Sequence, residues 1–234
     1  MDSSSTSLSH AIYSDPAFVK QYAASIKDNA WNAYYERPAS LSLLPPLQGL
    51  DVFDAGCGPG LTTRMMLEAG ANVTAADYSE QMLQTARETT DGAVTFLIQD
   101  LNDPLALPDG GFDVVYCTLV IHYVDDLYLL FNEFWRILRP GGILVFSTDH
   151  PGRPGFSEPE RKQVTEVEWS SYNIRMKVYE RSWKEVEDPC LAAGFHIERM
   201  LEPRPDQAAE EADPEAYAYL SQNKHFICVR AVKG

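Results

Sequence analysis

Apolar and polar residues alternate along the middle of the chain in a pattern that predicts successive strands and helices. Short apolar runs predict buried strands at residues 51–55, 72–76, 94–98, 112–117 and 143–148. Apolar residues recur at helical spacing in the segments 62–69, 79–88 and 126–138. Short connections between such elements are typical of a parallel sheet covered on both faces. We therefore expect an α/β fold with a Rossmann-like, doubly wound sheet.

The pattern is less regular outside this region. We expect a disordered start, a first helix over 16–27, a half-exposed strand at 174–178, a helix over 184–193 and final strands at 195–201 and 225–232. An acidic stretch, 202–223, predicts a long loop with a short helix after Asp213-Pro214. A single domain results, which we divide into an N-terminal helical lid (1–40), a core (50–150), an inserted cap (151–183) and the C-terminal part of the sheet (184–234).

Composition narrows the class of partner. The chain has 234 residues, 45% of them apolar, which is enough for one large domain. Its net charge of −15 argues against nucleic acid or an anionic membrane as the main partner. The four cysteines show no paired spacing, so neither a disulfide framework nor a metal site is expected. The N-terminus has no leader-like pattern, and we expect a cytoplasmic monomer or homodimer that acts on a small molecule.

A glycine-rich turn follows the first predicted strand. Residues 54–60 read Asp-Ala-Gly-Cys-Gly-Pro-Gly, after which a helical pattern begins. Glycine permits positive φ and close approach of a ligand to the main chain, and the first turn of a helix offers unpaired N–H groups. The residues expected to meet a ligand here are Asp54, Gly56, Cys57, Gly58 and Gly60.

Acidic residues stand at the ends of the next two predicted strands. Asp77 lies about twenty residues beyond the glycine turn, where one carboxylate can accept hydrogen bonds from both hydroxyls of a ribose. Asp100 can accept from the exocyclic amine of a purine, with the Leu101 N–H donating to a ring nitrogen and with Tyr78 and Met82 covering the ring faces. Either aspartate alone fits an ordinary loop or cap, but together they indicate a nucleoside.

The glycine spacing G-x-G-x-G departs from the G-x-G-x-x-G of dinucleotide sites. Residues 53–60 instead resemble the first motif of the class I S-adenosylmethionine-dependent methyltransferases. Residues 73–79, 99–101, 112–115 and 138–142 are similar to that family's later motifs. The resemblance covers residues 50–148 and implies a seven-stranded sheet of order 3-2-1-4-5-7-6 with strand 7 antiparallel. Residues 35–39, 122–123 and 150–151 look like the small-molecule branch near the quinone-biosynthesis methyltransferases.

The resemblance implies S-adenosylmethionine as cofactor and S-adenosylhomocysteine as product. Asp54 is then expected to orient the turn or, indirectly, the methionine amine, and the 56–60 backbone to contact the methionine moiety. A carbonyl near Cys117 or Thr118 is expected to receive the amine, and Tyr22 is a weaker candidate for the carboxylate.

Methyl transfer needs chiefly an oriented nucleophile and exclusion of water. If the acceptor must lose a proton, histidine is the base best matched to neutral pH, and His150 and His122 both follow strands that end at the expected crevice. Both histidines could equally be packing or capping residues. Aromatic residues of the lid and cap suggest a partly aromatic acceptor, and the residues proposed to contact it are Trp31, Tyr34, Tyr35, Tyr123, Trp169 and Tyr172.

The sequence thus predicts an enzyme that transfers a methyl group to an O, N or activated C atom of a small, partly aromatic metabolite. A cofactor-binding partner without turnover, or a catalyst of a non-methylating rearrangement, stays open at this stage. A nicotinamide-dependent oxidoreductase fits the glycine spacing less well.

Overall fold

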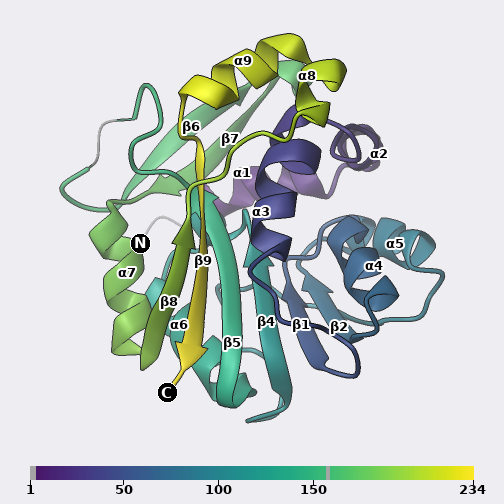
Figure 1. Cartoon of the computed structure of the whole chain (residues 1–234), viewed down its shortest axis with the longest axis vertical. Helices are drawn as coiled ribbons and strands as arrows, with labels where there is room; N and C mark the ends of the chain where they lie inside the picture. The colour runs from purple at the N-terminus through teal and green to yellow at the C-terminus, as the bar shows by residue number, and fades with distance from the viewer. Residues whose placement is uncertain (1–3, 157–158) are drawn as a thin grey trace.

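The computed structural model describes residues 4–156 and 159–234, and a seven-stranded sheet of order β3-β2-β1-β4-β5-β9-β8 forms its centre (Figure 1). β9 pairs antiparallel with both β5 and β8, and the other strands of this sheet run parallel. The expected order and the expected antiparallel strand are thereby confirmed. The strands are β1 (Asp51–Ala55), β2 (Asn72–Asp77), β3 (Thr95–Ile98), β4 (Phe112–Thr118), β5 (Leu138–Asp149), β8 (Phe195–Leu201) and β9 (Phe226–Lys233).

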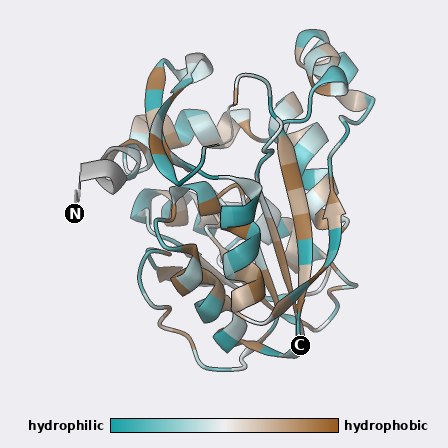
Figure 2. Cartoon of the chain, turned by 90° about the vertical axis from the view of Figure 1, so that its left-hand side faces the viewer, coloured by the Kyte–Doolittle hydropathy of each residue, from teal (hydrophilic) through white to brown (hydrophobic). Residues whose placement is uncertain are grey.

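Helices cover both faces of this sheet, as the continuous apolar strands require. Successive residues of a strand point to opposite faces, so Val114 packs in one core and Val115 in the other. The first core is completed by α6 and α7, and the second by α4 and α5. In Figure 2 the central strands are largely hydrophobic while the helices show mixed surfaces. These helices are α4 (Leu61–Glu68), α5 (Glu80–Thr89), α6 (Leu127–Ile137) and α7 (Trp183–Ala192).

The N-terminal region is helical from Ser4 onward, so the expected disordered start is wrong for its described part. α1 (Ser4–Tyr13) precedes α2 (Pro16–Ser25), which begins at the predicted proline and is capped by Asp15. A five-residue π-helical turn, η1 (Asn32–Glu36), then leads into α3 (Arg37–Leu41). A π-helical turn is rare and occurs often at functional sites.

The cap contains a hairpin that stands apart from the main sheet. β7 (Ile174–Glu180) confirms the predicted half-exposed strand, and β6 (Gln163–Trp169), which we did not predict, pairs with it in antiparallel register. The hairpin contacts the N-terminal region, where the Ser9 hydroxyl donates to the Lys177 carbonyl at 2.9 Å. The loop between these strands contains η3 (Ser170–Tyr172).

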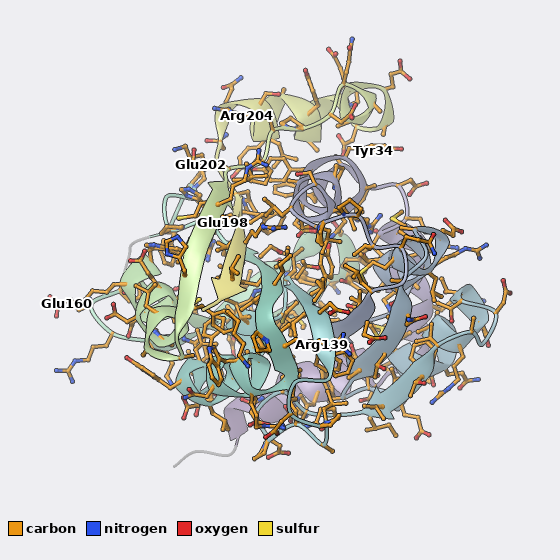
Figure 3. The ribbon with its side chains drawn as sticks, turned by 60° about the horizontal axis from the view of Figure 1, so that its bottom comes forward. Tyr34, Arg139, Glu160, Glu198, Glu202 and Arg204 are labelled. Carbon is orange, nitrogen blue, oxygen red and sulfur yellow. The ribbon has the colours of Figure 1, made fainter. Side chains whose placement is uncertain are left out.

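The acidic stretch after β8 holds more helix than expected. α8 (Ala208–Ala212) and α9 (Pro214–Gln222) occupy it, and Asp213 caps the second of them by accepting from the Ala216 N–H at 2.9 Å. These helices pack against η1 and against Phe226 at the start of β9, and the Asp206 N–H donates to the Tyr34 carbonyl at 2.7 Å. Figure 3 shows Tyr34 near this C-terminal segment.

The strand order reverses between β1 and β4, and a crevice at the carboxyl ends of neighbouring strands is the usual ligand position in such sheets. η2 (Ile121–Tyr123) follows β4 at this edge. Within 4–156 and 159–234, no helix is long and apolar enough to cross a membrane.

Candidate active site

The turn after β1 uses three glycines with φ of +78° at Gly56, +52° at Gly58 and +82° at Gly60. A side chain at Gly60 would place Cβ 2.9 Å from the Ala86 Cα, so close packing against α5 excludes larger residues there. The Gly56 N–H donates to the Ala76 carbonyl at 2.8 Å, which ties the turn to β2. Open space surrounds Gly58, where a ligand can approach the backbone.

Asp77 is fixed beside this turn by two backbone donors. Its carboxylate accepts from the Gly58 N–H at 3.0 Å and from the Ser79 N–H at 2.9 Å. Burial raises the pKa of Asp77 to about 6, although these two hydrogen bonds act in the opposite direction and the Asp100 charge adds to the rise. A carboxylate held in this way keeps acceptor capacity for the two hydroxyls of a ribose.

Asp54, near the carboxyl end of β1, contacts α4. Its Oδ2 accepts from the Thr63 hydroxyl at 2.6 Å, and burial raises the pKa of Asp54 to about 7. This contact ties β1 to the helix that follows the glycine turn.

Asp100 lies at the end of β3 and meets a residue that sequence reasoning missed. Its Oδ1 accepts from the Asn102 backbone and side-chain amides at 2.9 and 2.8 Å, and its Oδ2 lies 3.5 Å from His10 Nε2. The His10 ring stacks on Tyr78 with centroids 4.0 Å apart. His10 belongs to α1, whose Ser-rich sequence shows no apolar periodicity.

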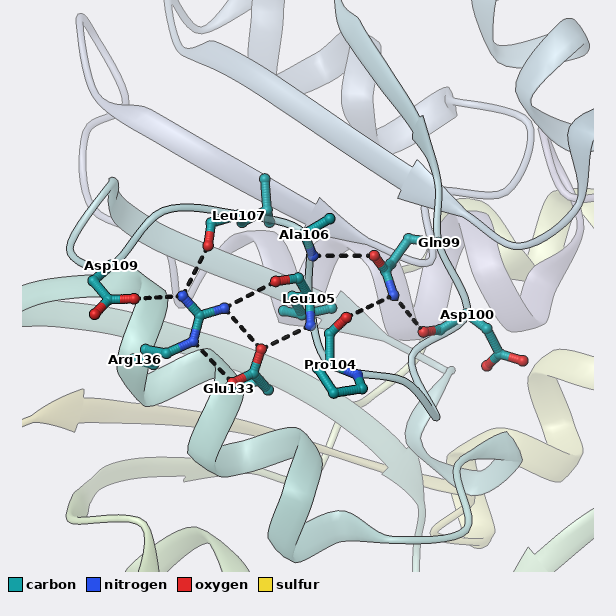
Figure 4. A network of polar contacts seen from close by, with 9 residues as sticks. All are labelled: Gln99, Asp100, Pro104, Leu105, Ala106, Leu107, Asp109, Glu133 and Arg136. Atoms are coloured by element: carbon teal, nitrogen blue, oxygen red, sulfur yellow. Dashed lines mark hydrogen bonds and ion pairs between the residues drawn. The ribbon is translucent and has the colours of Figure 1, made fainter.

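A polar network holds the loop that carries Asp100 (Figure 4). The Gln99 side-chain amide donates to the Asp100 carbonyl at 2.7 Å and accepts from the Ala106 N–H at 3.3 Å. Arg136, on α6, donates to the Leu105 and Leu107 carbonyls at 3.0 and 2.8 Å and pairs with Glu133 and Asp109. Protein contacts alone therefore anchor the loop to α6.

The expected cofactor residues gather around one cavity, with two exceptions. Gly60 shapes the turn without lining the cavity, and Cys117 points into the core beneath α6. The expected residues that line it are Tyr22, Asp54, Gly56, Cys57, Gly58, Asp77, Tyr78, Met82, Asp100, Leu101 and Thr118. Their convergence fits a nucleoside with an amino-acid tail.

Three further lining residues come from the turn around η1, which sequence reasoning had assigned to an aromatic lid. Asn32, Glu36 and Arg37 face the cavity, and Glu36 and Arg37 are only 4% and 7% exposed. The aromatic residues of the same turn face elsewhere. Because a π-helical turn displaces side chains from the ordinary helical positions, sequence spacing could not show which face looks inward.

Trp31, Tyr34 and Tyr35 do not line the cavity, which corrects their expected contact with the acceptor. Tyr35 is 1% exposed and packs against α8 and α9, where its hydroxyl accepts from the His225 N–H at 3.0 Å. Trp31 packs against the His225 ring with centroids 4.6 Å apart. The two C-terminal helices supply the apolar partners of these rings.

A second aromatic group does face the cavity. Tyr13, Tyr22 and Tyr123 line it, and the Tyr13 and Tyr123 hydroxyls lie 3.1 Å apart. Trp169 stacks on Tyr22 with centroids 6.1 Å apart, and Tyr172 contacts both rings from behind. Of the expected acceptor residues, Tyr123 thus reaches the cavity directly, while Trp169 and Tyr172 support its wall.

The two proposed bases lie on the other side of η2, in a smaller cavity next to the hairpin and α7. His150 Nδ1 accepts from the Gly152 N–H at 2.8 Å, so a neutral ring carries its proton on Nε2, 3.3 Å from Glu202. His122 Nδ1 is buried and finds no hydrogen-bond partner among the described residues, and burial lowers the pKa of His122. Neither histidine lines the cofactor cavity, which corrects their placement at the reacting atoms.

Arg181 keeps the two cavities apart by holding the segment between them. Its guanidinium donates to the carbonyls of Ile121, Val124 and Asp125, the last at 2.9 Å. Burial lowers the pKa of Arg181 to about 10. In the described ranges, no three His, Cys, Asp or Glu side chains come together as a potential metal site.

This sheet order, the glycine turn and the acidic strand ends define a Rossmann-like methyltransferase fold. A family model described as a methyltransferase domain matches residues 53–146. An S-adenosylmethionine-dependent methyltransferase of Mesorhizobium loti is similar in structure, with a TM-score of 0.68 and 32% identity over 84% of this chain and 96% of that one. The chain therefore belongs to the class I S-adenosylmethionine-dependent methyltransferases.

Two sequence relatives show how far the similarity extends. A malonyl-[acyl-carrier protein] O-methyltransferase of Pectobacterium atrosepticum is 43% identical over 108 residues, which are 46% of this chain and 42% of the relative. The match thus spans less than half of that enzyme's length. An uncharacterized protein of Haemophilus influenzae is 30% identical over 196 residues, 74% of this chain and 77% of the relative.

Proposed function

We propose that this enzyme methylates an O, N or activated C atom of a small, partly aromatic metabolite. The observation that carries the proposal is the aromatic wall formed by Tyr13, Tyr22 and Tyr123 on one side of the cofactor cavity. Tyrosine rings offer a large, rigid apolar surface with a polar edge, which suits a flat acceptor that also carries polar groups.

When bound, S-adenosylmethionine supplies a methyl group that is already activated by its sulfonium. Transfer would form the new bond from the acceptor's lone pair to the methyl carbon while the carbon–sulfur bond breaks with its electron pair on sulfur, and an acceptor that is not already ionised would release its proton to solvent. Asp77 and Asp100 hold the nucleoside end, and the wall around Tyr123 excludes water and orients the acceptor. Orientation of this kind contributes up to roughly 7–11 kcal/mol to such reactions.

A malonyl-type carboxylate is a second candidate acceptor. The similarity to the malonyl-[acyl-carrier protein] O-methyltransferase favours it, and so does the placement of His122 and His150 outside the cavity. A carboxylate is ionised at neutral pH and can attack the methyl group without a base, whereas a phenol cannot do so as readily.

Transfer of an isotopically labelled methyl group distinguishes these acceptors. The protein is incubated with labelled cofactor and either a metabolite extract or a malonyl thioester, and mass spectrometry detects the methylated product. For the aromatic acceptor, Tyr123→Ala is expected to raise KM about tenfold by removing stacking contacts, while Tyr123→Phe keeps KM within about threefold. Labelling of the malonyl thioester alone, with KM insensitive to Tyr123→Ala, would contradict an aromatic acceptor.

A further inference from the structure

Glu36 is a buried carboxylate that faces the cofactor cavity. It ends the π-helical turn η1, is 4% exposed, and lies between the cavity-lining residues Asn32 and Arg37 in the sequence. Its Oε1 accepts a hydrogen bond from the Ser147 hydroxyl at 2.6 Å. Ser147 itself is on β5, so this bond places the carboxylate over the carboxyl end of the central sheet.

No ion pair compensates this charge among the described residues. Arg37 follows directly in sequence, but its guanidinium donates to the Ile26 carbonyl at 2.7 Å and forms no ion pair with Glu36 within 4.0 Å. Burial raises the pKa of Glu36, and the hydroxyls of Ser147 and Ser40 and the more distant charge of Arg37 offset the rise only in part. A buried carboxylate without a cationic partner is costly, which indicates that a cation completes the site.

The order of the strands indicates which part of the cofactor lies next to Glu36. Asp77 ends β2 and Asp100 stands two residues beyond the end of β3, so the proposed partners of the ribose and the adenine lie at one side of the cavity. The cofactor's amino-acid end must then extend past β1 toward β4 and β5. Leu119 follows β4 with φ of +55°, and its N–H donates to the Ser147 hydroxyl oxygen at 3.0 Å. Ser147 thus joins Glu36 to the end of β4.

We propose that Glu36 binds the α-ammonium group of the cofactor's methionine moiety. The cofactor carries two cationic groups, the ammonium and the sulfonium, and only the ammonium can donate hydrogen bonds to a carboxylate. Arg37 and Asn32, on the same turn, are placed to meet the neighbouring carboxylate. This assignment rests on the cofactor class and is independent of the acceptor, and it adds a side-chain partner to the main-chain carbonyl expected near Thr118.

A purely structural role is the alternative, in which Glu36 only fastens η1 to β5 through Ser147. The two roles differ in their dependence on the ligand's amino group. The experiment therefore compares S-adenosylhomocysteine with its deamino analogue, in which hydrogen replaces the amino group, by calorimetry on the wild-type protein and on Glu36→Gln. Glutamine is nearly isosteric and can still accept from the Ser147 hydroxyl.

Glu36→Gln is expected to weaken S-adenosylhomocysteine about 10- to 100-fold, the range of a charge-assisted hydrogen bond, and to leave the affinity for the deamino analogue within about twofold. Asp100→Asn, at the adenine end, serves as the matched control and should weaken both ligands by the same factor. Equal losses for both ligands with Glu36→Gln, or no loss with either, would overturn the assignment.

Thermal unfolding without ligand provides a second measurement. If Glu36 is held for the cofactor, Glu36→Gln should keep or raise the melting temperature, because the substitution removes an uncompensated buried charge. A melting temperature lowered by several degrees, together with equal affinity losses, would identify Glu36 as a structural residue. A wild-type protein that binds neither ligand would overturn the cofactor assignment, and this proposal with it.

Discussion

The two sides of the cavity are lined by different types of residue. On the side proposed to hold the nucleoside, called the nucleoside side below, short carboxylates and backbone amides lie at or shortly after the ends of β1, β2 and β3, as with Asp77 and Asp100. On the side that faces the hairpin, the wall consists of aromatic side chains from distant segments, among them Tyr13, Tyr22 and Tyr123. The nucleoside side follows from sheet topology, whereas the aromatic side depends on how separate segments pack.

The two sides also differ in charge, because the nucleoside side contains buried carboxyl groups. The pH dependence of stability tests this difference and is the largest effect that we expect. Burial raises the pKa of Asp54 to about 7 and that of Asp77 to about 6, above their unfolded values near 3.9. The folded protein therefore binds more protons than the unfolded chain between these values, and stability falls as pH rises through this window. Asp54→Asn should remove the part of this stability loss that Asp54 causes, which is of the order of a few kcal/mol in the free energy of unfolding between pH 5 and pH 8.

Urea unfolding of the ligand-free protein at pH 5 and pH 8 measures this change. The wild-type protein should lose more stability than Asp54→Asn on going to pH 8. His122 and His225, whose pKa values burial lowers, act in the opposite direction in both proteins and cancel in the comparison. An identical pH dependence of stability in the two proteins would show that burial does not raise the pKa of Asp54.

Asp77 provides the next largest effect. Asp77→Ala removes the acceptor for the Gly58 and Ser79 amides and the partner proposed for the ribose, so cofactor affinity should fall about 100-fold. Tyr123→Ala, on the aromatic side, should change the same affinity less than about threefold. Isothermal calorimetry with S-adenosylhomocysteine measures both, and a greater loss for Tyr123→Ala would reverse the division of roles between the two sides.

His150 should show the smallest effect on turnover. Because Gly152 and Glu202 contact its two ring nitrogens outside the cofactor cavity, His150→Asn is expected to change kcat less than about threefold. The measurement is labelled methyl transfer at saturating cofactor and acceptor, with His122→Asn as the companion variant. A tenfold loss of kcat in either variant would restore that histidine as a base at the acceptor side.

Much of the nucleoside side could be predicted from sequence because its signals are local. Five apolar runs gave the central strands, and parallel strands bring their carboxyl ends to one edge, so Asp77 and Asp100 could be joined without knowing any contact. The spacing of the glycines is also a local signal, and it argued against a dinucleotide-binding turn.

The remainder could not be predicted because it depends on long-range packing. α1 has no apolar period of its own and is held by partners such as Ser79, whose hydroxyl donates to the Tyr13 carbonyl at 2.7 Å. Glu36 stands in a run of aromatic residues, and only the π-helical turn turns it inward. In β6, by contrast, Val167 and Trp169 alternate with Glu166 and Glu168, a pattern that is short but visible in the sequence.

The loop behind Asp100 carries a thermodynamic consequence. Gln99 and Arg136 already fix its main chain through hydrogen bonds to Ala106, Leu105 and Leu107. A loop that is ordered before binding loses little conformational entropy when the adenine arrives, so more of the contact enthalpy there is retained as affinity. Arg136 does not line the cavity, so in the proposed binding mode it acts on adenine affinity only through this loop.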